Sequence, residues 1–328
     1  MERFVFVAAI VAAVIFGIGA VFGNGNGFHF NIDEDGRGSA PITAIVAGRL
    51  EPEAFTGSEL RLKHLAAVVV IVPEDRTDFL IEIDNPGGTP MPTVSSADGR
   101  VIVDGQLRGR ISGCEEDGGA SLRGYENVTL AQLPRITIRA PRTLDVDRNG
   151  AGTTEIGASE ALSLDFSGCS TATIADVTGE LDLEIAGSGD VRTGAARRLS
   201  ADIAGSADVI VGAISEGADI DIAGSGSVTI ASLSGELSTD AAGSGSVTIQ
   251  GGAVTIASID LAGSGDVSIT APVQSLNVAI VGSGDVDVAG VVGEIEADIA
   301  GSGGVTAQSV TGEVRKEVWG SGDVVVGR

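Results

Sequence analysis

The stretch Ile185-Ala186-Gly187-Ser188-Gly189-Asp190-Val191 decides the fold, because close copies of it recur to the end of the chain. The phrase Gly-Ser-Gly, with one Gly-Ser-Ala variant, begins at Gly187, Gly205, Gly224, Gly243, Gly263, Gly282, Gly301 and Gly320. The spacings are 18, 19, 19, 20, 19, 19 and 19 residues. A degenerate copy begins at Gly168 and has Cys169 in place of the serine. A fixed period of this kind indicates a repeat architecture.

The residues around each glycine alternate between apolar and polar. Valine stands four residues after the first glycine in every copy, from Val191 to Val324. The positions two and six residues before the glycine are also apolar, and the residues between them are mostly polar. A period of two is typical of half-buried strands. Each unit is therefore expected to contain a strand of about six residues, a Gly-Ser-Gly turn, a shorter strand and a second corner.

A unit of 19 residues cannot bury its apolar face alone, whereas stacked units can. The sequence therefore predicts an all-β fold, a β-solenoid of the right-handed parallel β-helix type. Its coils should hold about 19 residues, with equivalent residues about 4.8 Å apart. A β-sandwich of hairpins is the alternative, but a sandwich does not require the same residue types at one fixed offset in every unit.

The predicted solenoid is regular over residues 161–328. Its last unit is expected to be a cap, because Lys316 occupies a core position and Trp319 precedes the glycine. Residues 41–160 alternate less regularly, and they form either early, irregular coils or a separate small β-domain.

The N-terminal residues 1–23 have the pattern of a targeting segment. Residues 4–22 hold 19 residues without a charge, and a helix of that length reaches about 28 Å, close to the roughly 30 Å of a membrane's hydrocarbon core. The segment is either a cleaved signal peptide or an uncleaved anchor. Both interpretations place the rest of the chain in the periplasm or cell envelope, in the second case attached to the inner membrane. Residues 24–40 read as a flexible spacer.

The composition excludes several classes of function. The formal net charge is −25, and a chain this acidic repels nucleic acids and anionic lipid headgroups. Only 3% of the residues are aromatic, which argues against a haem or flavin enzyme, and no cofactor is expected. Residues 201–314 contain fifteen Asp and Glu but no Lys or Arg. Such a segment is poorly suited to uronate-rich polysaccharides, since carboxylate recognition uses Arg or bound cations.

The two cysteines and two histidines limit the chemistry further. Cys114 and Cys169 are either a disulfide, as an oxidising compartment would allow, or two separate thiols. His29 lies in the spacer and His64 precedes an apolar run, so the chain offers too few ligands for zinc and no convincing catalytic triad. We therefore predict no catalytic residue.

Acidic residues recur at two fixed positions of the repeat. One row lies three residues before the glycine and contains Glu184, Asp202, Asp221, Asp240, Asp260, Asp298 and Glu317. The other lies three residues after it and contains Asp190, Asp208, Asp266, Asp285 and Asp323. Stacked carboxylates suit hard cations, so the second row is a candidate cation ladder. The alternative, which we prefer, is a solvated face beside a hydrogen-bonded row of serines.

The iterated Gly-Ser-Gly-Asp-Val after an Ile-Ala step, as in residues 185–191, resembles the head GIN domain family. That family comprises bacterial envelope proteins described as auto-transporter adhesins. The resemblance covers about residues 45–328 and implies a β-helical fold. The family has no established catalytic residues to carry over.

These observations together predict a non-enzymatic, exported β-solenoid of the cell envelope that acts as a surface, adhesion or scaffold module. Its partner would be an envelope polysaccharide or protein, and residues 4–22 would make its only membrane contact. The alternative is a polysaccharide-active β-helix enzyme with its site in residues 49–148. A deep cleft there, lined by both arginines and carboxylates, would favour the enzyme.

Overall fold

The computed structural model describes residues 43–115 and 117–327, and these residues form a nearly all-β protein with a β-solenoid of about ten turns. The predicted β-solenoid is therefore confirmed. The expected targeting segment and spacer lie outside the described residues. Within the described residues, no helix is long and apolar enough to span a membrane. Two compact units can be distinguished. In the first, the N-terminal unit, the structure describes residues 43–115, 117–197 and 207–211. In the second, the C-terminal unit, it describes residues 198–206 and 212–327.

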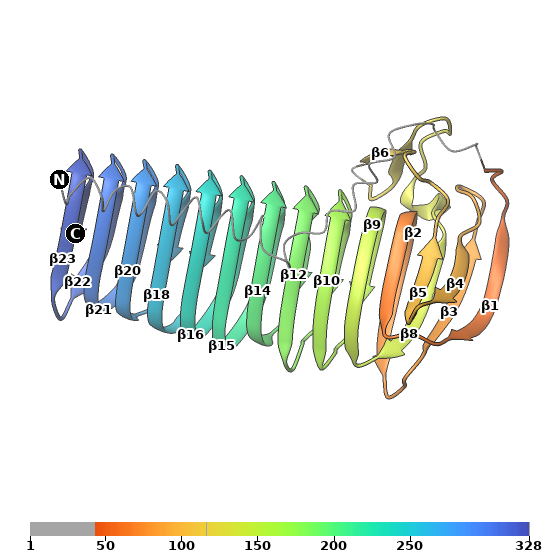
Figure 1. Cartoon of the computed structure of the whole chain (residues 1–328), viewed down its shortest axis with the longest axis horizontal. Coiled ribbons are helices and arrows are strands. Elements are labelled where there is room, and N and C mark those ends of the chain that lie inside the picture. The colour runs from red at the N-terminus through yellow and green to blue at the C-terminus, as the bar shows by residue number, and fades with distance from the viewer. Residues whose placement is uncertain (1–42, 116, 328) are drawn as a thin grey trace. The chain divides into compact units, whose positions relative to one another are not determined.

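The C-terminal unit consists of regular coils whose strands run parallel to those of the next coil (Figure 1). Its strands are β16 (Ser227–Gly243), β17 (Ser246–Ile249), β18 (Gly252–Gly263), β19 (Asp266–Ile269), β20 (Val273–Gly282), β21 (Asp285–Gly301), β22 (Gly304–Val310), β23 (Val314–Gly320) and β24 (Asp323–Val326). Two further strands, β14 (Ala196–Gly205) and β15 (Asp208–Gly224), contribute residues to both units.

The register of these strands places equivalent residues of successive coils side by side. Val247 pairs with Val228 on one side and Val267 on the other, and Val286 follows Val267. These valines are buried, as are Ile222, Leu261, Ile280 and Ile299, which lie two residues before their glycines. The core of the unit is thus a set of straight rows of identical or similar aliphatic side chains.

The first glycines of the Gly-Ser-Gly phrases form a row, the glycine row, in which both the backbone conformation and the close contact between coils require glycine. Gly263 has φ +135°, and a Cβ added to it would lie 2.2 Å from the carbonyl oxygen of Gly243 in the preceding coil. Gly282 and Gly301 stand in the same relation to Gly263 and Gly282. Only glycine adopts this conformation without cost, and only glycine allows the backbones of successive corners to approach this closely.

The N-terminal unit contains coils in a different order from the sequence. Its strands are β1 (Gly48–Phe55), β2 (Glu59–Glu74), β3 (Phe79–Asn85), β4 (Thr93–Ala97), β5 (Arg100–Asp104), β6 (Ile111–Cys114), β7 (Ala120–Leu122), β8 (Arg135–Pro141), β9 (Thr143–Ile156), β10 (Ala161–Gly168), β11 (Thr171–Ile174), β12 (Glu180–Gly187) and β13 (Val191–Thr193). Strand β2 pairs in parallel with β5 and β8 on one side and with β9 on the other. The first coil of the sequence is therefore the second of the stack.

Antiparallel strands cover the outer side of the coil formed by β5 and β8. Strand β3 pairs antiparallel with β8, β1 pairs with β3, and β4 pairs with β5. The outer strand β1 has a register irregularity between Leu50 and Glu53 and contains Pro52. Irregularities and proline blunt the edge of a sheet against further pairing.

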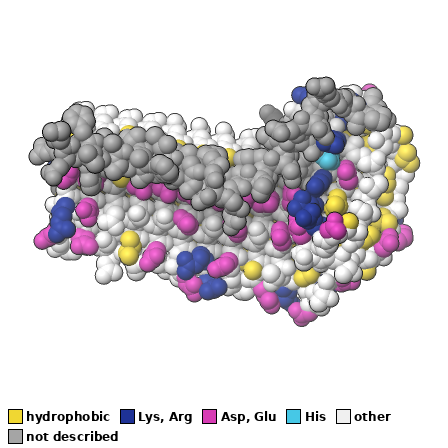
Figure 2. All heavy atoms as spheres, viewed as in Figure 1, with side chains coloured by type: hydrophobic (Ala, Val, Ile, Leu, Met, Phe, Trp, Pro, Cys, Tyr) yellow, Lys and Arg dark blue, Asp and Glu magenta, His cyan; other side chains and the backbone are white. Residues whose placement is uncertain are grey.

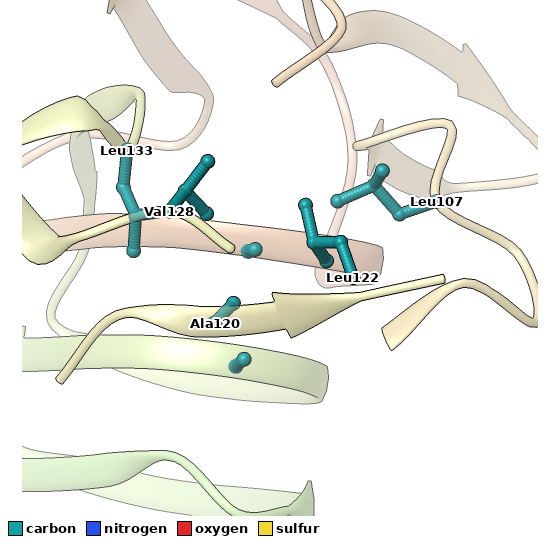
Figure 3. Packing of buried hydrophobic residues seen from close by; sticks show 7 residues of the cluster. Leu107, Ala120, Leu122, Val128 and Leu133 are labelled. Atoms are coloured by element: carbon teal, nitrogen blue, oxygen red, sulfur yellow. The ribbon is translucent and has the colours of Figure 1, made fainter. Parts of the chain in front are cut away.

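An insertion interrupts the same coil between β5 and β8. Residues 105–133, which we call the strap, contain β6, β7 and the 3-10 turn η1 (Leu130–Gln132). Strands β6 and β7 form a separate two-stranded antiparallel sheet. Five aliphatic residues of the strap, Leu107, Ala120, Leu122, Val128 and Leu133, cluster together (Figure 3). The same cluster includes Ala66 of β2 and Ala151 of β9, so the strap buries the outward side of these two coils.

Lys316 occupies a position of the repeat that is mostly apolar in the earlier coils. Its side chain in β23 is exposed, and its Nζ lies 2.8 Å from Asp323 Oδ1. Its coil partner in the register is Ala297, which is buried. A lysine is accommodated at this core position because its ammonium group reaches an aspartate outside the core.

Candidate binding surfaces

The coils of the C-terminal unit present two outward faces, one from the short strands that follow each Gly-Ser-Gly turn and one from the long strands that precede it. On the short-strand face, one row contains Thr229, Thr248, Ser268, Asp287 and Thr306, and the next contains Ser227, Ser246, Asp266, Asp285 and Gly304. Each of these residues is half-buried or exposed. The face therefore repeats small hydroxyl and carboxylate side chains at the spacing of the coils.

The candidate cation ladder contributes to the short-strand face, and its carboxylates accept backbone hydrogen bonds. Asp266 Oδ1 accepts from the backbone N–H of Asp285 at 3.0 Å, and Asp285 Oδ1 accepts from that of Gly304 at 2.8 Å. Asp323 accepts from Lys316 and from the N–H of Val324, and the hydrogen bond with Lys316 is the main cause of its lowered pKa. Each of these carboxylates thus shapes the corner of the coil.

The two remaining members, Asp190 and Asp208, lie in the N-terminal unit beside β13 and at the start of β15. Across residues 43–115 and 117–327, no three His, Cys, Asp or Glu side chains are arranged to hold a metal ion. That the ladder is a solvated face rather than a cation groove stays a prediction.

The long-strand face of the C-terminal unit carries the other acidic row. The pKa of Asp221 is raised to about 7, by burial first and by the neighbouring Asp202 and Asp240 second. The pKa of Asp240 is raised to about 6, again by burial first and by Asp260 second. Burial is thus a larger cause of these raised pKa values than repulsion between the carboxylates of neighbouring coils. Figure 2 shows acidic side chains spread over these coils.

The N-terminal unit has a groove of about 430 Å³ on the outer side of its antiparallel strands. It is lined by Pro52, Glu74, Arg76, Leu80, Glu82, Thr137 and Arg139. Its charged groups pair with one another or with residues at its edge. Glu74 pairs with Arg139 and lies 3.7 Å from Arg76, while Glu82 accepts from Arg49 at 2.6 Å. The groove combines arginines and carboxylates, as the enzyme alternative requires, but in mutually neutralised pairs.

His64 is the only histidine among the described residues. It lies in β2 and has a left-handed backbone conformation with φ 49°. Its Nδ1 lies 3.5 Å from Asp104 Oδ1, and this interaction is the main cause of the lowered pKa of Asp104. His64 lies where β2 shifts register against β9, because two residues of β2, Lys63 and His64, stand between Leu62 and Leu65 opposite one residue of β9. Its place in the fold is thus a bulge of the coil.

Sequence reasoning missed Arg148, which is fully buried in β9. Its guanidinium donates to the carbonyl oxygens of Leu65 at 3.0 Å and Ala151 at 2.6 Å, and burial lowers its pKa to about 10. Arg148 pairs in register with Phe166, which occupies an ordinary core position. The signal was an arginine two residues before Gly150, where the regular coils have an aliphatic side chain. It satisfies carbonyl groups beside the bulge of β2.

A disulfide joins Cys114 of β6 to Cys169, with the two Cα atoms 5.7 Å apart. Gly168 pairs with Gly150 on one side and Gly187 on the other, so Cys169 is in register with Ala151 and Ser188. The cysteine thus occupies a serine position of the corner and ties the strap to the coil beyond Ala151.

Several solved structures are similar to this chain. A "Putative lipid binding protein" from Parabacteroides distasonis is 16% identical, with 84% of this chain and 97% of that chain covered and a TM-score of 0.40. A "putative adhesin" from Parabacteroides merdae is also 16% identical, with coverage of 85% and 96% and a TM-score of 0.39. A "putative adhesin" from Parabacteroides distasonis is 13% identical, with coverage of 87% and 100% and a TM-score of 0.40. No curated protein matches the chain.

One protein family matches in three overlapping stretches, residues 115–253, 181–291 and 238–327. Its description is "Putative auto-transporter adhesin, head GIN domain". The matches begin in the strap and include every Gly-Ser-Gly phrase of the sequence. Together they span well over half of the chain, which therefore belongs to the head GIN domain family.

Proposed function

We propose that the protein is an exported, non-enzymatic adhesion module of the cell envelope and that the short-strand face of its C-terminal unit is the adhesive surface. The observation that carries this proposal is the repetition of small polar side chains in straight rows on that face. An extended, repeating surface suits a partner that is itself extended and repetitive, such as a polysaccharide chain. The family description as an adhesin supports the same role.

The charge of the C-terminal unit narrows the class of partner. Residues 201–314 carry fifteen acidic side chains and no basic one, so a polyanionic partner would be repelled. The row of Thr229, Thr248 and Ser268 instead offers hydroxyl groups that both donate and accept hydrogen bonds. We therefore propose an uncharged, hydroxyl-rich polysaccharide of the envelope as the partner.

Two features support export. Residues 4–22 form an uncharged apolar stretch, and the Cys114–Cys169 disulfide is of a kind that persists in oxidising compartments. A reporter enzyme that is active only after export, fused after Arg328, should therefore be active. An inactive fusion that accumulates in the cytosol would overturn the proposed location.

The adhesive face is tested by adding bulk to one row of side chains at a time. The full-length variant with Thr229→Gln, Thr248→Gln and Ser268→Gln should lose at least tenfold in affinity for neutral envelope polysaccharide, measured by co-sedimentation. The control variant carries Ser238→Gln, Ser258→Gln and Asn277→Gln, a row on the long strands of the same region. The control should bind as the unmodified protein does. Equal binding by both variants would contradict the assignment of the face.

A further inference from the structure

The strap is attached to the coils mainly at its two ends and at one disulfide. At its roots, Gly105 N–H donates to Lys63 O at 3.0 Å and Val68 N–H donates to Pro134 O at 2.9 Å. Near its middle, Tyr125 OH donates to Thr43 O at 2.9 Å. The Cys114–Cys169 bond joins the strap to a third coil, beyond those of Ala66 and Ala151.

Most other hydrogen bonds of the strap are internal. The backbone groups of Ala120 and Val128 exchange two hydrogen bonds, at 2.8 and 3.0 Å, and Arg123 N–H donates to Arg110 O at 2.7 Å. The strap is therefore a local two-stranded unit, and such a unit is at best marginally stable in water without packing against other elements. The apolar contact between the strap and the coils is limited, because the coil residues at the cluster are Ala66 and Ala151, with Val68 of β2 packed against it.

The coils beneath the strap are held by other contacts. Strand β9 pairs with β2 on one side and with β10 on the other, in parallel ladders that include no strap residue. Both cysteines are half-buried, so the disulfide is not sealed in the core. It ties the strap to coils whose strand pairing does not include the strap.

We propose that the Cys114–Cys169 disulfide is a reversible lock that holds the strap on the corner of the solenoid, and that a dithiol releases the strap without unfolding the coils. One thiolate of the dithiol attacks a sulfur of the bond, and the other cysteine leaves as a thiolate. The second thiolate of the dithiol then attacks the dithiol sulfur of the mixed disulfide, and the remaining cysteine leaves as a thiolate. The dithiol ends as a cyclic disulfide, and its two protons end on Cys114 and Cys169.

Hydrogen exchange of the full-length protein, read by mass spectrometry, tests the lock. Dithiothreitol should raise the exchange rate of amides in residues 105–133 at least tenfold, while the ladder amides of β2, β9 and β10 keep their rates. Oxidised glutathione should restore the original rates. Unchanged exchange in the reduced strap would show that the apolar cluster holds it alone. Loss of protection throughout the coils would show that the disulfide is a structural staple instead, and either result overturns the proposal.

The variant with Cys114→Ala and Cys169→Ser should exchange like the reduced protein and should not respond to dithiothreitol. Serine is chosen because the corner has Ser188 at the neighbouring position of the row. The control Ser112→Ala alters an exposed strap residue and leaves the bond intact, so it should respond to dithiothreitol as the unmodified protein does. If the control also lost its response, the effect of reduction could not be assigned to this bond, and the proposal would fail.

Discussion

At the scale of single residues, the rows of identical side chains divide each strand into positions that tolerate change and positions that do not. Val247 is 1% exposed between Val228 and Val267, whereas its neighbour Thr248 points outward and is half-buried. Val247→Asp would place a carboxylate without a partner between two coils. It should lower the free energy of unfolding by at least about 3 kcal/mol, measured by thermal denaturation.

Thr248→Asp is the matched control for that substitution. The new carboxylate faces solvent, and the change should cost less than about 1 kcal/mol. Equal damage from the two variants would refute the assignment of inward and outward faces.

The row of corner glycines is a second set of positions that should not tolerate substitution. Gly263→Ala would bring a methyl group to 2.2 Å from Gly243 O, at a backbone φ of +135°. The backbone conformation alone should cost about 1–3 kcal/mol, and the contact adds to this. Gly251→Ala is the control, since its nearest new contact is at an ordinary 3.4 Å. It should change the melting temperature little, and a drop as large as that of Gly263→Ala would contradict the role given to the row.

At the scale of elements, the acidic row on the long strands should make stability depend on pH. The folded-state pKa of Asp221, about 7, and that of Asp240, about 6, exceed the value near 4 of an unfolded aspartate. The folded chain therefore binds more protons than the unfolded chain between about pH 4 and pH 7, and stability falls as the pH rises through this window. The melting temperature should be higher at pH 5.5 than at pH 8.

The double variant Asp221→Asn with Asp240→Asn should flatten that dependence and raise the melting temperature at pH 8. Asp287→Asn, on the short-strand face, removes one aspartate elsewhere and serves as the control. A double variant that kept the full pH dependence would show that other groups cause it.

The corner aspartates lead to a prediction about cations. Because Asp266 and Asp285 accept backbone hydrogen bonds from the next coil, calcium and sodium at equal ionic strength should raise the melting temperature alike, by screening. A saturable excess with calcium, lost in Asp266→Asn with Asp285→Asn, would make these aspartates a cation site.

The elements also show where sequence reasoning succeeds and where it stops. The regular coils could be predicted because each repeat places the same residue type at the same offset, so that pattern and packing agree. The order of β5, β8, β2 and β9 in the stack could not be predicted. These strands pair with strands that do not follow them in the sequence, and no repeat in the sequence indicates such pairing. Arg148 was missed for a similar reason, since its partners include Leu65 O, which lies beside a bulge in β2 that the sequence pattern does not show.

At the scale of the whole molecule, the family and the fold follow from the repeat, whereas the partner depends on which outward face is used. The candidate cation row was visible in the sequence as recurring aspartates. The hydrogen bonds that these aspartates accept were not, because they depend on the backbone orientation of the next corner. The groove between Arg76 and Glu82 was equally invisible, since antiparallel strands from distant parts of the sequence form it.

The constant register from one glycine corner to the next has a consequence for how such chains change length. Removing residues 264–282 takes out one whole period and joins Gly263 to Ser283, which restores the phrase Gly-Ser-Gly. The shortened chain should fold into a solenoid about 4.8 Å shorter, with an unchanged β-type circular dichroism spectrum per residue. Removing one residue fewer would leave two glycines at the junction and disturb the corner. Gene duplication and deletion can therefore set the reach of this protein in steps of one coil, while the chemistry of each face stays the same.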